Sequence, residues 1–382
     1  MPASPLTDIA QRLLANVERD HGDLAPGIMR LTTTNYTDPA MYQREIEQIF
    51  HKVPLAVALT VDIPNAGDYL AYDIAGRAIV VVRGDDGVAR TFVNACRHRG
   101  APVVCNGAGS TRRMTCPYHA WVFDTKGSLV GLPQREQFGD VGDLGDLGLL
   151  ELPTAERAGI VFSVLTPGAP MDIDEWLGEM QSALVMLELD KVYPHSTTTS
   201  LPSGNWKSTA DGYLDGYHIG FLHSSNLGLK QVNNRNTWDL FGPHVRLGFA
   251  NKTIVAQKGI PVEEWELTEV MSLVHYIFPN VSISGQPGRE TMVSRLLPGP
   301  SVSEATVVQF HYSRVPLDSP DKVQAMETRR KLYAAITGEE DFNTVIDINR
   351  TIPGMNGADF FFGRNESGNQ NLHTWVAKLS GS

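Results

Sequence analysis

The chain has 382 residues and a formal net charge of −11, and 42% of its residues are hydrophobic. This length favours about two domains with enough material for a buried core. The acidic balance argues against nucleic-acid binding, which needs a basic patch. No apolar run reaches the roughly 18 residues of a membrane helix, and the N-terminus lacks the basic start and apolar core of a secretory signal. We therefore expect a cytoplasmic protein that contacts neither membrane nor nucleic acid.

The N-terminal part of the chain predicts one helix followed by short strands. Residues 39–52 show an apolar stripe, with Asp38 as a candidate cap and Pro39 suited to the first helical position. From about 53 to 165 the pattern changes to strands separated by turns, such as the apolar run 78–83 and the Gly-Asp-Asp-Gly that follows it. Closely spaced hairpins without long helices indicate a small antiparallel β domain.

The C-terminal half predicts helices that wrap a second antiparallel sheet. A helix is expected at 172–189, alternating runs within 240–315 indicate strands, and another helix is expected from Ser319 to about residue 336. The predicted fold class is α+β. The expected domains are an N-terminal helical segment at 1–45 that packs on the C-terminal domain, a β domain at 46–165 and the C-terminal domain at 166–382.

The three cysteines, Cys96, Cys105 and Cys116, fall within one short stretch, which favours local chemistry over a disulfide framework. Cys96 and His98 form a Cys-x-His pair, and Cys116 and His119 form a Cys-x-x-His pair. Two thiolates and two imidazoles suit zinc or iron. Zinc is the weaker alternative, because the pairs lie between β-hairpins and nearby glycines let backbone N–H groups approach inorganic sulfides.

This segment resembles the Rieske ferredoxin family, in which proline often follows the second cysteine, as Pro117 does here. The resemblance implies a [2Fe–2S] cluster with two cysteines on one iron and two histidines on the other. High-potential respiratory members carry a disulfide between the ligand loops, and Ala101 and Tyr118 stand at those places, which implies the lower-potential kind. Cys105 fits neither role, and we expect it to be a buried small hydrophobe. The implied cluster ligands are Cys96, His98, Cys116 and His119.

A second constellation follows in the C-terminal half. His218 and His223 lie near Asp215 and can form, with a carboxylate, the facial triad of non-haem Fe(II) oxygenases. Because they are five residues apart, an ideal helix would place them about 140° apart, so a shared metal requires the helix to break. Gly220 allows such a break. Taken alone, two such histidines are more often structural than ligands.

The neighbouring residues resemble the catalytic domain of aromatic-ring-hydroxylating (Rieske non-haem iron) oxygenase α subunits. The match begins at Asn205-Trp206-Lys207 and continues through Asp-x-Tyr-His to a second histidine five residues on. The resemblance implies that His218 and His223 bind mononuclear iron. Both metal motifs occur in the order expected for this family, and the likeness runs from about residue 40 to 376.

The resemblance also assigns two aspartates near these histidines. It implies that Asp215 bridges the two metal centres by meeting His119 of a neighbouring subunit, and a head-to-tail contact of this kind closes into a ring of three. The family often has asparagine where this chain has Asp211. A carboxylate at that place either changes the charge near the iron or points away from it.

The third iron ligand is expected in the acidic run Gly338-Glu-Glu-Asp341 and the residues after it. Many family members have an acidic pair here whose aspartate binds iron, and the match assigns this role to Asp341. Glu340 is the second candidate and Asp347 a distant third. Without the two histidines, the same run would be interpreted as a solvated acidic surface.

The family resemblance implies a terminal oxygenase that activates O2 at mononuclear Fe(II). Its electrons would come from a ferredoxin or flavin reductase, and so indirectly from NAD(P)H. The expected reaction is hydroxylation, dihydroxylation or dealkylation of a small organic, aromatic substrate. The length favours a homotrimer, and the presence of a β subunit stays open. The alternative is a Rieske electron-transfer or binding protein without oxygenase activity.

Overall fold

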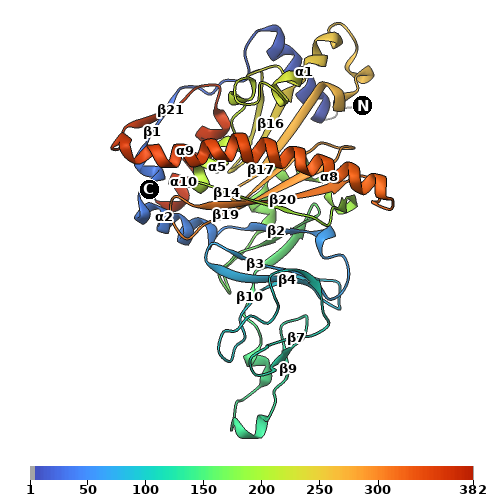
Figure 1. Ribbon diagram of the computed structural model, residues 1–382, viewed down its shortest axis with the longest axis vertical. Helices are drawn as coiled ribbons and strands as arrows, with labels where there is room; N and C mark the ends of the chain where they lie inside the picture. Colours follow the sequence, from blue (N-terminus) through green and yellow to red (C-terminus); the bar gives the residue numbers. More distant parts are fainter. Residues whose placement is uncertain (1–4, 382) are drawn as a thin grey trace. The chain divides into compact units, whose positions relative to one another are not determined.

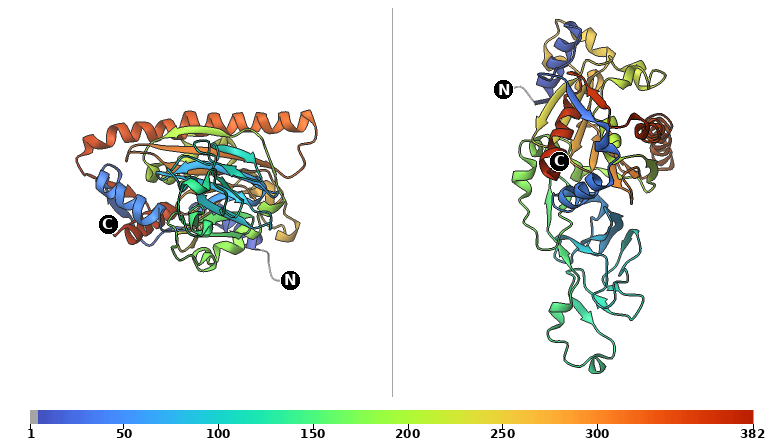
Figure 2. Two further views of the ribbon diagram at one scale, coloured as in Figure 1. Left: turned by 90° about the horizontal axis from the view of Figure 1, so that it is seen from below. Right: turned by 90° about the vertical axis from the view of Figure 1, so that its left-hand side faces the viewer.

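The structure, a computed structural model, describes residues 5–381 and divides the chain into two compact units (Figure 1, Figure 2). The large unit takes in the chain up to Glu45, the segment Leu177–Leu187 and the chain from Val192 onward. The small unit consists of Ile46–Trp176 and Glu188–Lys191. Both units are built on antiparallel sheets, and the α+β class predicted from the sequence is confirmed.

The small unit contains three antiparallel sheets, with strand orders β10–β5–β4–β3–β6, β11–β12–β2 and β7–β8–β9. The predicted strand at 78–83 is confirmed within β4, whose valines and isoleucine suit a pleated, buried strand. The strands are β2 (Leu55–Leu59), β3 (Asp68–Ile74), β4 (Arg77–Arg83), β5 (Ala89–Val93), β6 (Gly107–Ser110), β7 (Met114–Thr115), β8 (Val122–Phe123), β9 (Leu129–Gly131), β10 (Glu151–Leu152), β11 (Thr154–Arg157) and β12 (Ile160–Ser163).

The core of the small unit joins its sheets to the two loops that carry the Cys-His pairs. Val80 and Val82 of β4 and Phe92 of β5 belong to one buried cluster with Cys96 and Cys116. Burial of this apolar surface stabilises the loops as well as the sheet. The two predicted cysteine ligands are therefore part of the core, whereas His98 is half-buried and His119 is exposed at the tip of its loop.

The large unit is built on an eight-stranded antiparallel sheet with the order β13–β20–β19–β18–β17–β16–β15, in which β14 also pairs with β20. The strands predicted within 240–315 are confirmed, and β17 and β20 are among them. A separate pair joins β1 (Met29–Thr32) and β21 (Asp359–Phe362). The sheet strands are β13 (Tyr193–Pro194), β14 (Thr199–Ser203), β15 (Thr237–Phe241), β16 (His244–Ala250), β17 (Met271–Ile277), β18 (Val281–Ser284), β19 (Thr291–Pro298) and β20 (Ala305–Ser313).

Helices cover the large sheet, and α8 and α9 run in line along one side of it (Figure 1, Figure 2). Ile9 and Leu13 of α1 pack in a buried cluster with Met271 and Leu273 of β17. The helix predicted from Ser319 is confirmed, with the Ser319 hydroxyl as its cap. The remaining helices are α1 (Pro5–Glu18), α2 (Pro39–Glu45), α3 (Ile173–Leu177), α4 (Met180–Val185), α5 (Trp206–Tyr213), α6 (Leu227–Lys230), α7 (Leu267–Val270), α8 (Pro320–Ala335), α9 (Asn343–Thr351) and α10 (Ser367–Ser380).

Two predicted helices differ in detail from the structure. The helix expected at 172–189 is broken into α3 and α4, because Gly178 between them has a positive φ of 47°. The helix expected at 39–52 is confirmed as α2, which continues into a π-helical turn, Ile46–Phe50. Among the residues that the structure describes, no helix is long and apolar enough to cross a membrane.

Candidate metal centres

The two loops that hold the predicted cluster ligands share one backbone pattern. In the first loop the Gly100 N–H donates to the Cys96 carbonyl at 2.8 Å, and in the second the Ala120 N–H donates to the Cys116 carbonyl at 3.0 Å. Gly100 and Ala120 both have positive φ, at 76° and 55°. Such a φ is uncommon for alanine, so the second loop adopts a tight turn that glycine would favour.

The donor atoms on these loops fit an iron–sulfur cluster. The rings of His98 and His119 lie 4.6 Å apart, and His98 stacks on Trp121 at 5.1 Å with an interplanar angle of 6°. The Nδ1 atom of His98 is buried without a hydrogen-bond partner, as expected for an atom that serves as a metal ligand. Burial, and then the neighbouring Cys116 thiol, raise the pKa of Cys96. A bound metal would relieve both effects by holding thiolates.

Cys105 does not share this environment. It is exposed, so the prediction of a buried small hydrophobe is wrong. The physical reason is its position just before β6, which is the edge strand of the five-stranded sheet. An edge strand has one neighbour only and leaves part of its flanking loop open to solvent.

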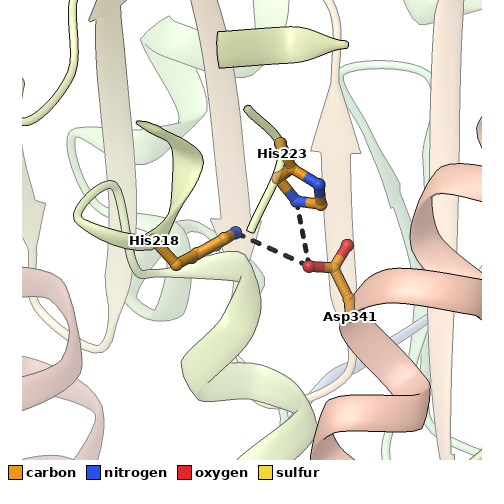
Figure 3. Close-up of side chains that lie close together, drawn as sticks. All are labelled: His218, His223 and Asp341. Atoms are coloured by element: carbon orange, nitrogen blue, oxygen red, sulfur yellow. Dashed lines mark ion pairs between the residues drawn. The ribbon is translucent and has the colours of Figure 1, made fainter. Parts of the chain in front are cut away.

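The second predicted centre lies in the large unit, where His218, His223 and Asp341 come together (Figure 3). One ligand atom from each residue lies within 4.8 Å of the other two. Asp341 Oδ1 is 3.0 Å from Nε2 of His223 and 3.5 Å from Nε2 of His218. Two imidazole nitrogens and one carboxylate oxygen that converge in this way are the donors of the facial triad that binds non-haem Fe(II).

Helix α5 leads into this centre and is anchored by the Asn-Trp-Lys segment. The Asn205 side chain caps the helix by accepting from the Lys207 N–H at 2.8 Å. The Lys207 ammonium is 2.5 Å from Glu45, and both side chains are 1% exposed. The Trp206 indole N–H donates to the same carboxylate at 2.8 Å. This buried ion pair fixes the start of α5, since removing either partner would leave an uncompensated buried charge.

The helix break predicted between the two histidines is present. Helix α5 ends at Tyr213, and His218–Gly220 forms a separate 3-10 turn. The Gly220 N–H donates to Asn233 Oδ1 at 3.0 Å, and a Cβ at Gly220 would collide with the Asn233 side chain. Any larger residue would require the Asn233 side chain to move, so glycine favours this approach. The break brings the two imidazole rings to a centroid distance of 5.0 Å.

The third donor comes from a π-helical turn, Ile336–Phe342, inserted between α8 and α9. Such turns occur frequently at functional sites. Asp341 faces both histidines, whereas Glu340, the second candidate for the ligand, binds Nδ1 of His223 at 2.5 Å. Asp347 is 68% exposed and pairs with Arg350, so it lies outside the cluster of donors. Sequence reasoning did not find the contact between Glu340 and the histidine, because the residues are distant in the chain.

Carboxylates set the electrostatics of the two histidines. Asp215 Oδ2 lies 3.0 Å from Nδ1 of His218, and its other oxygen accepts from the Tyr217 N–H at 2.6 Å. Burial lowers the pKa of His223, but Asp341 and Glu340 outweigh burial and the pKa is raised overall. A carboxylate at each Nδ1 favours the tautomer that carries its proton there, which would leave both Nε2 atoms to a bound metal.

Asp211 is directed to the C-terminal helix. Its Oδ2 accepts from the Tyr36 hydroxyl at 2.7 Å, and its Oδ1 lies 2.9 Å from Nε2 of His373. The Asn369 amide donates both to Oδ1 and to the Asp211 main-chain oxygen. These contacts use both carboxylate oxygens and join α5 to α10 and to the 3-10 turn Thr33–Tyr36.

A pocket of about 410 Å³ adjoins the three donors and is lined by residues from several strands and helices. Its apolar wall includes Leu227, Phe249, Leu273 and Met292. Its polar part includes the ion pairs Arg289–Glu269 and Arg329–Glu290. Because these residues come from strands and helices spread over the sequence, sequence reasoning could not name them.

Residues 189–382 match the ring hydroxylating alpha subunit (catalytic domain) family, and residues 53–153 match the Rieske [2Fe-2S] domain. The chain belongs to the ring hydroxylating alpha subunit family. The resemblance stated from the motifs is thus confirmed. A Rieske [2Fe–2S] cluster and a mononuclear iron are the cofactors of this family, and the zinc alternative for the Cys-His pairs is set aside.

Individual members of this family are about one third identical to the chain over the aligned regions. The glycine betaine monooxygenase oxygenase subunit of Chromohalobacter salexigens is 30% identical over 222 residues, covering 58% of this chain and 47% of that protein. The carnitine monooxygenase oxygenase subunit of Escherichia coli K12 is 34% identical over 189 residues, covering 49% and 50%. The chain thus spans about half the length of these relatives in the matched regions.

The fold agrees with that of a solved family member. A quaternary ammonium Rieske monooxygenase superposes with a TM-score of 0.79 over 98% of each chain, at 20% sequence identity. At 20% identity this structural similarity shows the fold alone. The arrangement of sheets and helices is therefore that of a Rieske oxygenase alpha subunit along nearly the whole described chain.

Proposed function

We propose that the chain is a terminal oxygenase that activates O2 at a mononuclear Fe(II) and oxidises a small organic substrate. The observation that carries the proposal is the convergence of His218, His223 and Asp341 beside a pocket of about 410 Å³. A chain that also contains a Rieske domain has the means to accept electrons for this chemistry.

Each donor residue has one part in this proposal. The cluster is held by Cys96, His98, Cys116 and His119, and the mononuclear iron is held by His218, His223 and Asp341. When bound, the iron supplies the redox chemistry that activates O2, and the cluster supplies electrons one at a time. Three protein donors on one side leave positions open toward the pocket.

Asp215 is proposed as the bridge that carries electrons to the iron. It accepts a hydrogen bond from Nδ1 of His218 at 3.0 Å and is 22% exposed, so it is accessible to a second chain. We propose that it meets His119 of a neighbouring subunit in a homotrimer. Asp211, whose two oxygens are occupied by other residues, is proposed to hold α5 in place.

We propose that the electron source is a ferredoxin or flavin reductase that draws on NAD(P)H, and that the chain works in the cytoplasm. The reaction is hydroxylation, dihydroxylation or dealkylation. The substrate is a small molecule that meets both the apolar wall and the charged pairs of the pocket. The proposed domains are the N-terminal segment 1–45, the Rieske domain 46–165 and the catalytic domain 166–382.

Iron analysis tests the proposal directly. An oxygenase predicts about three iron atoms per chain, two in the cluster and one mononuclear, whereas a pure electron carrier predicts about two. Substrate-dependent NADH oxidation with a surrogate reductase, over a panel of aromatic compounds and quaternary amines, then identifies the substrate. Absence of the EPR signal of a reduced Rieske centre would contradict both the oxygenase and the carrier.

A further inference from the structure

Glu340 contacts a predicted iron ligand on the side that faces away from the metal. Its Oε2 lies 2.5 Å from Nδ1 of His223, and its Oε1 accepts from the Asn226 amide at 2.8 Å. The His223 side chain is 2% exposed, so water does not compete for this contact, whereas Glu340 is 27% exposed. Both carboxylate oxygens of Glu340 therefore have a partner, one in the His223 ring and the other in the Asn226 amide at the start of α6.

Adjacent carboxylates hold opposite nitrogens of the same imidazole. Glu340 takes Nδ1 of His223, and Asp341 Oδ1 lies 3.0 Å from its Nε2. In a regular helix two successive side chains point about 100° apart, and the π-helical turn Ile336–Phe342 presents both of them to one ring. The ring can neither rotate nor exchange its tautomer without breaking one of these two contacts.

The same arrangement exists once more in the site. His218 has Asp215 at its Nδ1, at 3.0 Å. The two carboxylates differ in what holds their second oxygen, which is the main-chain N–H of Tyr217 for Asp215 and the side chain of Asn226 for Glu340. Each proposed iron ligand with an imidazole ring thus has its own carboxylate, and Asp215 is the one that the family resemblance assigns.

We propose that Glu340 is a positioning residue for the mononuclear iron, which orients His223 and strengthens its donation to the metal. The inference rests on the proposed function. Carboxylates that accept from the remote nitrogen of a metal-bound histidine fix its tautomer and raise its basicity, and their loss typically costs about 10- to 100-fold in metal affinity. Glu340 acts through His223 and is not itself a ligand.

The test is the Fe(II) affinity of the protein with its cluster intact and the mononuclear iron removed, measured by titration. Glu340→Gln retains the size of the side chain, but its amide group then faces the Asn226 amide, donor against donor. We expect Fe(II) binding to weaken by about 10- to 100-fold, with the EPR signal of the reduced cluster unchanged. The double variant E340Q/N226D restores an acceptor opposite the new amide and should recover part of the affinity.

Glu339→Gln provides the matched control. Glu339 lies on the same π-helical turn, is exposed, and undergoes the identical chemical change. Its affinity for Fe(II) should equal that of the parent protein. Equal affinity of E340Q and the parent would overturn the inference while leaving the proposed function intact. A parent protein that binds no Fe(II) at this site would overturn the proposed function instead.

A Co(II) titration separates loss of orientation from loss of folding. Co(II) in the same site reports its ligand field by visible absorption, and E340Q should shift that spectrum while the thermal unfolding of the protein stays that of the E339Q control. A spectrum identical to that of the parent at saturating Co(II) would contradict an orienting role for Glu340.

Discussion

The two proposed metal centres of this chain hold their donors by different means. In the cluster loops the main chain fixes the shape of the turns, because the N–H groups of Gly100 and Ala120 donate to the cysteine carbonyls. In the iron site the donors come from segments far apart in the chain, and side-chain carboxylates orient the two imidazoles. We therefore expect substitutions of neighbouring side chains to disturb the donors of the iron site more than those of the cluster loops.

The largest expected effect comes from removing an iron ligand. In His218→Ala the mononuclear iron should be lost, and turnover should fall by more than the roughly 100-fold that loss of an outer partner costs. Iron content and substrate-dependent oxygen uptake measure both. The cluster EPR signal should stay at the parental level. Full turnover of H218A would contradict the assignment of this site.

Removing a predicted cluster ligand tests whether the iron site binds its metal independently of the cluster. Cys116→Ala should abolish the Rieske EPR signal and all reductase-dependent turnover, because no electrons reach the iron. Fe(II) binding in the large unit should remain, since its donors are His218, His223 and Asp341. Loss of Fe(II) binding together with the cluster would show that the two centres are not held independently.

Substitution of Asp215 should slow electron transfer between the two centres without removing a metal from either of them. Asp215→Asn keeps an acceptor for Nδ1 of His218 but removes the negative charge. At saturating Fe(II), which offsets any loss of affinity at His218, we expect both metals to be bound and the reoxidation of the reduced cluster by O2, in the presence of substrate, to slow by about 10- to 100-fold. Stopped-flow absorption follows this step, and an unchanged rate would refute the bridging role.

A smaller effect is expected at Asp211. Its carboxylate accepts from Tyr36 and Asn369 and lies against His373, so in Asp211→Asn the new amide faces at least one donor. The free energy of unfolding should fall by about 1–3 kcal/mol, as measured by urea denaturation. The matched control is Asp347→Asn, an exposed position where the same change should alter stability by less than about 0.5 kcal/mol.

A pH-dependent effect is expected at Glu366, which lines a pocket of about 200 Å³ together with Asp211 and Asp215. Burial, opposed by the Gly363 N–H and reinforced by Asp215 and Asp211, raises the pKa of Glu366 from 4.5 to about 7. When folding raises the pKa of a carboxyl group, the folded protein loses stability as the pH rises from the pKa of the unfolded state to that of the folded state. The melting temperature of the parent relative to that of the Glu366→Gln variant should therefore fall as the pH rises from 5 to 8. A difference in melting temperature between the two proteins that does not change with pH would contradict this.

The Rieske domain could be predicted from the sequence because the four expected ligands lie within residues 96–119 and their spacing is itself the signal; the domain is confirmed, and the four ligand assignments stay predictions. Sequence reasoning also reached the break at Gly220, because periodicity showed that an unbroken helix could not bring His218 and His223 together. Asp341 came from the family resemblance alone. The contact of Glu340 with His223 and the pocket wall were out of reach, since they depend on how distant segments pack. Cys105 was misjudged because composition does not reveal which strand becomes an edge.

The π-helical turn Ile336–Phe342 has a consequence for how such a protein changes over generations. This turn accommodates one residue more than a regular α-helix of the same rise. Deleting one residue from it would let α8 and α9 join as a continuous helix and would turn Asp341 about 100° away from the histidines. We expect the fold to survive and the proposed set of iron donors to be lost. If the chain is the oxygenase proposed above, a single codon then separates it from an inert relative of the same shape.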